Sequence, residues 1–320
     1  TDRNGSNIQR IITDCLKSDP KDIMLISAYP RPSVQGKWDH LSPVIWYRKG
    51  RSPGVLISAT TRTQGVIANV DIAPTLLNCL DPDRQSVVGG TGHLISSVDL
   101  SGSVALISNL DDLVTANGHA ETPIFVIIGV LAFIMFLAGL VWRHNPSGRW
   151  LGRFATTWIY TLPVSALLVT LLKPVSPSTL IAETMVVMTL TSVLSCVISG
   201  GKENSLVSFH RISGLTLLVC VLDAVTGQNM MKFCSVTGYL LNGIRFYGVG
   251  NEYMGVMIAS TVFLISQAQK PKRIALPMMA LVSIILILPT IGAKAGGAIV
   301  SVTCFGSYLL LLNSKKLKIW

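Results

Sequence analysis

The segment R-F-Y-G-V-G-N-E-Y-M-G-V, residues 245–256, carries the residue types best suited to binding an anion and moving a proton. Arg245 offers a cation, Tyr247 an aromatic ring, and Asn251 and Glu252 stand where an apolar helix is expected to begin. A short polar side chain and a carboxylate at a helix start also satisfy unpaired backbone N–H groups. The segment therefore predicts either an anion-binding site or a helix cap.

A second segment, L-P-T-I-G-A-K-A-G-G at residues 288–297, combines a cation with a glycine-rich helix start. Exposed N–H groups at a helix start bind phosphate. We expect Lys294 and Arg245 to form an anion pocket, with Asp223 or Glu252 as the general base. The alternative interpretation of Lys294, and of Lys173, is a long side chain that reaches from an apolar span to the membrane interface.

The elements that must position these residues are membrane helices. Half of the 320 residues are hydrophobic, only 13% are charged, and the mean hydropathy is +0.55, whereas soluble domains average about 25% charged residues. Residues 122–142 contain no charge and match the roughly 20 apolar residues that cross a bilayer. Six further spans are predicted, which makes about seven in all: residues 158–172, 180–199, 212–226, 253–268, 274–292 and 295–312.

The basic residues predict the orientation of these spans. Eleven of them fall in the loops on one side and four on the other, which is the asymmetry of cytoplasmic loops. This pattern explains the net charge of +10 without a nucleic-acid partner, and it makes residues 1–121 extracytoplasmic. The acidic and basic residues of the spans then share the outer side, which argues against an ion relay through the bilayer.

Residues 1–121 have the composition of a globular segment. Short apolar runs bounded by Pro, Gly and charged residues indicate buried strands, and residues with helical periodicity alternate with them. This alternation predicts an α/β layer. The expected helices are residues 7–17, 71–79 and 103–115, and the expected strands are residues 22–28, 43–47 and 54–58.

The run S-A-T-T-R-T-Q-G-V-I-A-N-V-D-I-A-P-T-L-L, residues 58–77, resembles the C-terminal part of alkaline-phosphatase-superfamily domains of the type I phosphodiesterase branch. The resemblance covers about residues 20–100 and implies a phosphatase-like α/β segment over residues 1–118. The apolar spans make residues 119–320 a transmembrane domain. The residues that match are Thr61, Arg62, Gly65, Asn69, Asp71, Ala73, Pro74 and Thr75.

The same resemblance implies that the segment is not catalytic. Active members end an earlier strand in S-D-H-G, whose Asp and His bind metal, whereas here the strand continues into Ala28, Tyr29 and Pro30. Asp39 and His40 stand near the place where some relatives keep a late metal histidine, but two ligands cannot make a binuclear centre. No metal site is therefore predicted.

The membrane part, with the motifs around Asp223, Asn251 and Lys294, is similar to a group of bacterial multi-pass proteins that carry such a domain before the first span. This resemblance implies a bacterial cell membrane and no particular activity. The group commonly has a neutral residue where this chain has Lys294. Because the chain begins with Thr1, we expect it to be a fragment of a longer protein.

The leading functional hypothesis is a multi-pass membrane protein that binds or processes a phosphate-bearing lipid or glycan precursor at the outer leaflet in cell-envelope biogenesis. One alternative is a metal-dependent phosphodiesterase or phosphatase with its nucleophile in a missing N-terminal part, and this alternative alone requires a divalent metal. The other is a transporter. Whether the protein is an enzyme stays open, as do its protein partners and a Cys15–Cys79 disulfide.

Overall fold

The computed structural model describes residues 2–27, 41–81, 92–198, 205–237 and 246–313. The chain is mostly helical and divides into two compact units. The N-terminal unit comprises Thr1–Ala59 and Gln64–Asp111, and the helical unit comprises Thr60–Thr63 and Asp112–Trp320. This division falls a few residues before the predicted domain boundary at residue 118.

The N-terminal unit contains the predicted strands and helices, but they are arranged differently from the expected layer. Strands β1 (Asp22–Ile26) and β2 (Val44–Arg48) form one antiparallel pair, and β3 (Gly54–Ile57) and β4 (Ser96–Asp99) form another. Strands of an α/β layer are covered on both faces, whereas Ile45 and Tyr47 of β2 are exposed. The described strands thus make two small sheets, accompanied by α1 (Asp2–Lys17) and α2 (Ile72–Leu80).

Asp71 organises the start of α2. Its side chain is fully buried, with Oδ2 accepting a hydrogen bond from the Ala68 N–H at 3.0 Å and Oδ1 accepting one from the His93 N–H at 2.9 Å. The carboxylate therefore joins the turn η1 (Asn69–Asp71) to the segment before β4.

Thr75 makes a second link between the same two segments. Its hydroxyl donates to the Asp71 carbonyl at 2.6 Å and accepts from the Ile95 N–H at 2.9 Å. Gly92 is required nearby, because a Cβ atom there would overlap the Val70 carbonyl. The D-I-A-P-T run thus has a structural role here.

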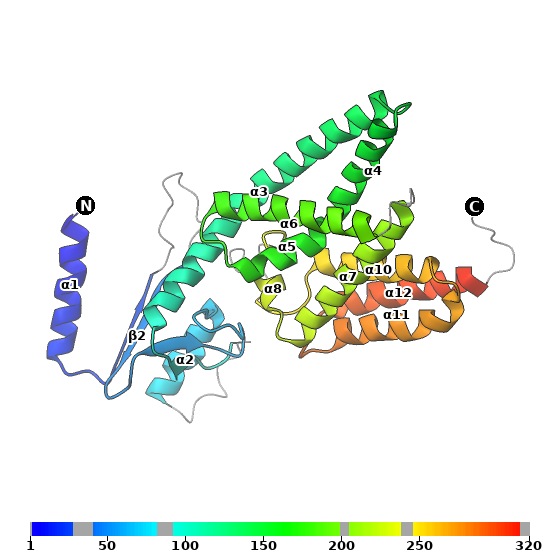
Figure 1. The fold of residues 1–320 in the computed structure, drawn as a ribbon. Coiled ribbons are helices and arrows are strands. Elements are labelled where there is room, and N and C mark those ends of the chain that lie inside the picture. The colour runs from blue at the N-terminus through cyan, green and yellow to red at the C-terminus, as the bar shows by residue number, and fades with distance from the viewer. Residues whose placement is uncertain (1, 28–40, 82–91, 199–204, 238–245, 314–320) are drawn as a thin grey trace. The chain divides into compact units, whose positions relative to one another are not determined.

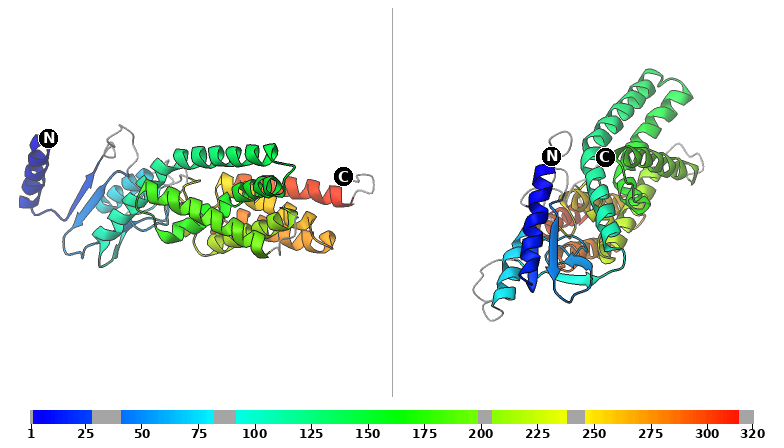
Figure 2. Two further views of the ribbon diagram at one scale, coloured as in Figure 1. Left: turned by 45° about the horizontal axis from the view of Figure 1, so that its top comes forward. Right: turned by 90° about the vertical axis from the view of Figure 1, so that its left-hand side faces the viewer.

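The helical unit is a bundle of apolar helices (Figure 1). Helix α3 is continuous over 39 residues, and the division between the units falls within it. Figures 1 and 2 show α10, α11 and α12 side by side. The helices of this unit are α3 (Ser103–Val141), α4 (Pro146–Tyr160), α5 (Leu162–Val169), η3 (Thr170–Leu172), α6 (Pro177–Ile198), α7 (Ser205–Val225), α8 (Asn229–Lys232), α10 (Asn251–Ser266), α11 (Pro271–Ile287) and α12 (Ala295–Asn313).

Four helices of the described chain, α3, α6, α7 and α12, are long and apolar enough to span a membrane. The count becomes five if α4 and α5–η3, which are bent by 52° at their junction, form one span. Helices α10 and α11 have 16 and 17 residues. At a rise of 1.5 Å per residue they reach about 25 Å, less than the about 30 Å of a hydrocarbon core. Seven spans therefore stay a prediction.

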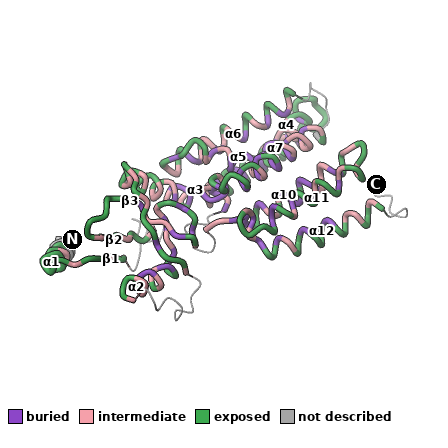
Figure 3. The backbone as a smooth tube through the Cα atoms, turned by 90° about the horizontal axis from the view of Figure 1, so that it is seen from below, coloured by how far each residue is buried: buried purple, intermediate pink, exposed green. Residues whose placement is uncertain are grey.

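The bundle packs around two apolar clusters. One contains residues of α5, α7, α10, α11 and α12 around Tyr253, Met257 and Leu286. The other contains residues of α3, α4, α5 and α6 around Ile128 and Met188. Figure 3 shows buried residues where α7, α10 and α11 face one another and exposed residues along α6 and α12. Large exposed apolar side chains along these outer faces suit contact with lipid.

Candidate anion-binding site

Gln228 brings three loops together at one end of the bundle. Its side-chain amide donates to the Ile291 carbonyl and accepts from the Gly248 N–H, and its exposed fraction is only 3%. The neighbouring Val249 N–H donates to the Gly292 carbonyl at 2.9 Å. The two segments that sequence analysis selected, around residues 251 and 294, therefore lie beside each other and beside the end of α7.

Lys294 is held at this junction by a tight turn between α11 and α12. Gly292 approaches the α11 backbone so closely that a Cβ atom would overlap the Ile285 carbonyl, and Ala293 has a left-handed φ of 49°. The Lys294 side chain is 7% exposed, and its ammonium group donates to Asn251 Oδ1. The structure thus joins two of the predicted site residues directly, at the starts of α10 and α12.

Asp223 is occupied by backbone groups. Oδ1 accepts from the Met230 N–H and Oδ2 from the Met231 N–H, both at 2.8 Å, and the residue is 2% exposed. Both N–H groups belong to the short helix α8, so the carboxylate stabilises its start. This geometry gives Asp223 a structural role, and its role as a general base stays a prediction. Glu252, in the first turn of α10, is exposed.

Lys232 and Arg62 add two cations that sequence analysis did not select as site residues. The Lys232 ammonium donates to the Arg62 carbonyl at 3.3 Å, and the Arg62 guanidinium lies 3.9 Å from the centre of the Tyr247 ring. Arg62 adopts a left-handed φ of 51°, and its side chain is exposed. The predicted aromatic residue Tyr247 therefore forms a cation–π contact within the protein.

The charge of Lys232 is costly in this position. Burial lowers the pKa of Lys232, the carboxylate of Asp223 raises it in part, and the positive charge of Arg62 lowers it further. A bound anion would offset this burial by supplying a counter-charge. Arg62, Lys232 and Lys294 together therefore make this end of the bundle suited to an anion.

Cys234 lies in the same region but serves packing. Its thiol is 3.2 Å from the Tyr253 hydroxyl, which also donates to the Pro163 carbonyl at 3.0 Å. Burial raises the pKa of Cys234 to about 11, so the thiolate that a nucleophile requires is disfavoured. In the N-terminal unit, Cys15 and Cys79 are both free thiols.

The signals for the missed residues were weak in the sequence. In the sequence, Arg62 belongs to the T-R motif and Lys232 is one basic residue between two apolar spans, and nothing in their spacing links them to Tyr247 or Asp223. Gln228 follows a Gly in an ordinary turn sequence. Three predicted candidates, Arg245, Asp39 and His40, lie outside the residues that the structure describes.

Within the described residues, no group of three His, Cys, Asp or Glu side chains is arranged to hold a metal ion. Comparison of the chain with protein-family models, with curated proteins and with solved structures finds no match. The alkaline-phosphatase-like segment and the bacterial membrane group therefore stay predictions from the resemblance of the motifs.

Proposed function

We propose that the protein is a multi-pass membrane protein that binds a phosphate-bearing lipid or glycan precursor at the outer leaflet, in cell-envelope biogenesis. The observation that carries this proposal is that Arg62 contacts both Lys232 and Tyr247, while Gln228 ties the loop of Tyr247 to the turn that carries Lys294. The carboxylate of Asp223 is engaged by backbone groups, so the cations are the groups that an incoming ligand would meet.

Phosphate is the ligand that this chemistry favours. Helix starts present N–H groups and a partial positive charge, and the two here are followed by helices of 16 and 19 residues. Lys294 and Lys232 are less than a tenth exposed, and a charge pair is stronger where water is excluded. A phosphate oxygen would replace Asn251 as the acceptor of Lys294.

A lipid-linked ligand fits the surroundings of the site. The loops adjoin apolar helices, two of which, α7 and α12, are long enough to span a membrane. The eleven-to-four distribution of basic residues in the loops favours the outer side for this end of the bundle. Binding is supported better than catalysis, because Glu252 is the one predicted acid–base residue whose carboxylate is exposed.

The test is an affinity comparison between a polyprenyl monophosphate and the matching polyprenol, with the full chain in nanodiscs. The wild type should bind the phosphate at least about tenfold more tightly, which corresponds to about 1.4 kcal/mol. The double variant R62Q/K294Q should lose most of this preference. Lys173→Gln removes an exposed cation that is predicted on the same, outer side of the membrane. This variant should keep the preference for the phosphate over the alcohol.

Equal affinities of the wild type for the phosphate and for the alcohol would overturn the proposal. An equal loss in the Lys173→Gln control would also overturn it, because the effect would then be one of net charge. The fold of each variant is checked by its thermal unfolding temperature.

A transporter is the second candidate, and the bend between α4 and α5 favours it. The two helices meet at 52° around Thr161, with Pro163 just beyond, and broken helices are common in transporters. Movement of the polyprenyl monophosphate from one face of a sealed vesicle to the other would support transport. Binding without movement supports the first proposal.

A further inference from the structure

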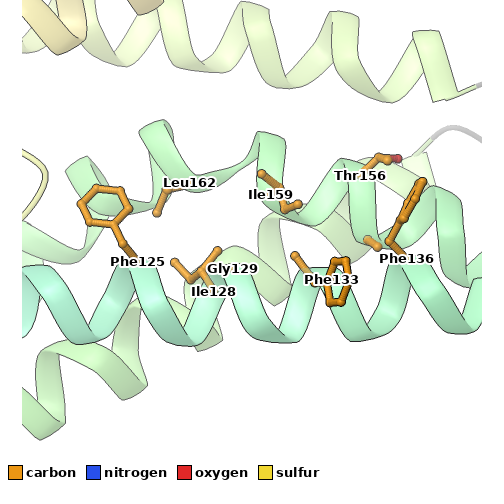
Figure 4. A pocket seen from close by; sticks show the side chains of 10 residues that line it. Phe125, Ile128, Gly129, Phe133, Phe136, Thr156, Ile159 and Leu162 are labelled. Carbon is orange, nitrogen blue, oxygen red and sulfur yellow. The ribbon is translucent and has the colours of Figure 1, made fainter.

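An apolar groove separates α3 from the facing helices α4 and α5. It has a volume of about 430 Å³ and is lined almost entirely by carbon. Figure 4 shows three phenylalanines of α3 on one side of it and residues of α4 and α5 on the other. The residues of the groove that matter here are Phe125, Phe133, Phe136, Ile159 and Leu162.

Glycines set the shape of this groove. At the closed end, a Cβ atom on Gly139 of α3 would lie 2.8 Å from Gly152 Cα of α4, so the two backbones are in contact there. Toward the other end, a Cβ atom on Gly129 would meet no atom within 4 Å. The helices therefore diverge from the Gly139 end, and no side chain of the described residues fills the space beside Gly129.

Arginines surround the closed end. A second cavity of about 480 Å³ shares Phe136 with the groove and is lined by Arg143, Arg149 and Arg153. The chain has no acidic residue between residues 122 and 182. Arg143 and Arg149 are exposed, and neither takes part in an ion pair within the described part of the chain.

The dimensions match one leaflet of a bilayer. Phe125 and Phe136 are eleven residues apart on one helix, which is about 16 Å at 1.5 Å per residue, and half of a hydrocarbon core is about 15 Å. Helix α3 ends at Val141, and Arg143 lies in the turn that follows it. An acyl chain along the phenylalanines would thus place its headgroup at the arginines.

We propose that this groove is a specific site for an anionic phospholipid of the surrounding bilayer. One acyl chain lies along Phe125, Phe133 and Phe136, and the phosphate is bound by Arg143 and Arg149. Guanidinium groups hold phosphate oxygens through paired N–H donors, which is why a charged lipid is favoured over a neutral one. The arginines of this site lie at or just before the start of α4, and the proposal does not depend on the proposed anion-binding function.

The experiment uses the full chain in nanodiscs of equal parts phosphatidylglycerol and phosphatidylcholine, followed by native mass spectrometry of the lipids retained after release. The wild type should retain phosphatidylglycerol with at least about a tenfold preference, which corresponds to about 1.4 kcal/mol. The double variant R143Q/R149Q should lose that preference. The double variant K272Q/R273Q removes two exposed cations from the first turn of α11 and should keep it.

A second variant tests the acyl part without touching the arginines. Gly129→Leu places a side chain in the open groove, where nothing obstructs its Cβ atom. It should fold normally and lose retained phosphatidylglycerol at least about as much as the arginine variant does.

Several results would overturn the proposal. One is equal retention of the two lipids by the wild type, and another is an equal loss of preference in K272Q/R273Q. A third is unchanged retention in Gly129→Leu. A mass of two chains, abolished by Gly129→Leu, would show instead that a second copy of the protein occupies the groove.

Discussion

Asp71 in the N-terminal unit and Asp223 in the helical unit use buried carboxylates in the same way, but over different lengths of chain. Each accepts two backbone N–H groups, at 2.9 and 3.0 Å for Asp71 and at 2.8 Å for both bonds of Asp223. One of the partners of Asp71 is 22 residues away, whereas those of Asp223 are seven and eight residues away. Asp71 therefore closes a long segment, and Asp223 shapes a local turn.

This difference gives the two aspartates different roles: Asp71 stabilises the fold of its unit, and Asp223 positions residues near the proposed binding site. The turn that Asp223 shapes contains Gln228 and Lys232, which reach the neighbouring loops and Arg62. Asp71 and Thr75 bind backbone groups at the start of α2 and before β4. The same chemical device thus stabilises a small domain in one unit and holds a cluster of cations in the other.

The largest effect is expected for Asp71→Asn. The amide would present an N–H to a backbone N–H, which breaks one charge-assisted bond and leaves a buried donor without a partner. The free energy of unfolding of the N-terminal unit should fall by about 3 kcal/mol. Pulse proteolysis in urea, with fragments of the N-terminal unit identified by mass, measures this change.

Asp22→Asn is the matched control for Asp71→Asn. Asp22 forms an ion pair with Arg48 at 3.1 Å on the surface, and such pairs contribute at most about 1 kcal/mol. Equal losses of unfolding free energy in Asp71→Asn and Asp22→Asn would show that burial does not set the contribution of Asp71 to stability. The comparison of Asp71 with Asp223 as buried carboxylates would then fail.

Asp223→Asn should lower the free energy of unfolding by less, about 2 kcal/mol. The two backbone partners of Asp223 can move together with the short helix α8. Hydrogen exchange should become faster at the Met230 and Met231 amides. Glu252→Gln, which alters an exposed carboxylate nearby, should leave these amides protected. Unchanged protection in Asp223→Asn would contradict the structural role and favour the predicted role of the carboxylate as a base.

The sequence predicted the elements of this fold better than their arrangement. Apolar runs and helical periodicity located β1, β2, β3 and most of the helices, but not α4 or the short α8, because burial and periodicity are local properties of the chain. The pairing of β3 with β4 depends on residues about 40 positions apart, which no local pattern specifies. The short α10 and α11 likewise show that apolar length alone does not fix the number of spans.

The site was predicted in part for a related reason. Membrane depth makes a charged residue costly, so Asp223 and Lys294 stood out, and the structure brings their loops together through Gln228. The role of Asp223 was not visible, because its partners are backbone N–H groups that every sequence has. Arg62 was not selected because it is 185 residues from Tyr247 in the chain.

The smallest effect is expected in the pH dependence of the free energy of unfolding. This dependence distinguishes the cations Arg62, Lys232 and Lys294 of the helical unit from the N-terminal unit. Burial lowers the pKa of Lys232 from its ordinary value of 10.5. Between the lowered pKa and 10.5, the unfolded chain binds more protons than the folded one, so stability rises with pH through that window. Thermal unfolding of the wild type, followed by tryptophan fluorescence, should show this rise, and Lys232→Met should lose it. Lys272→Met keeps Lys232 and should retain the wild-type slope, so a slope that persists in Lys232→Met would assign the dependence to another group.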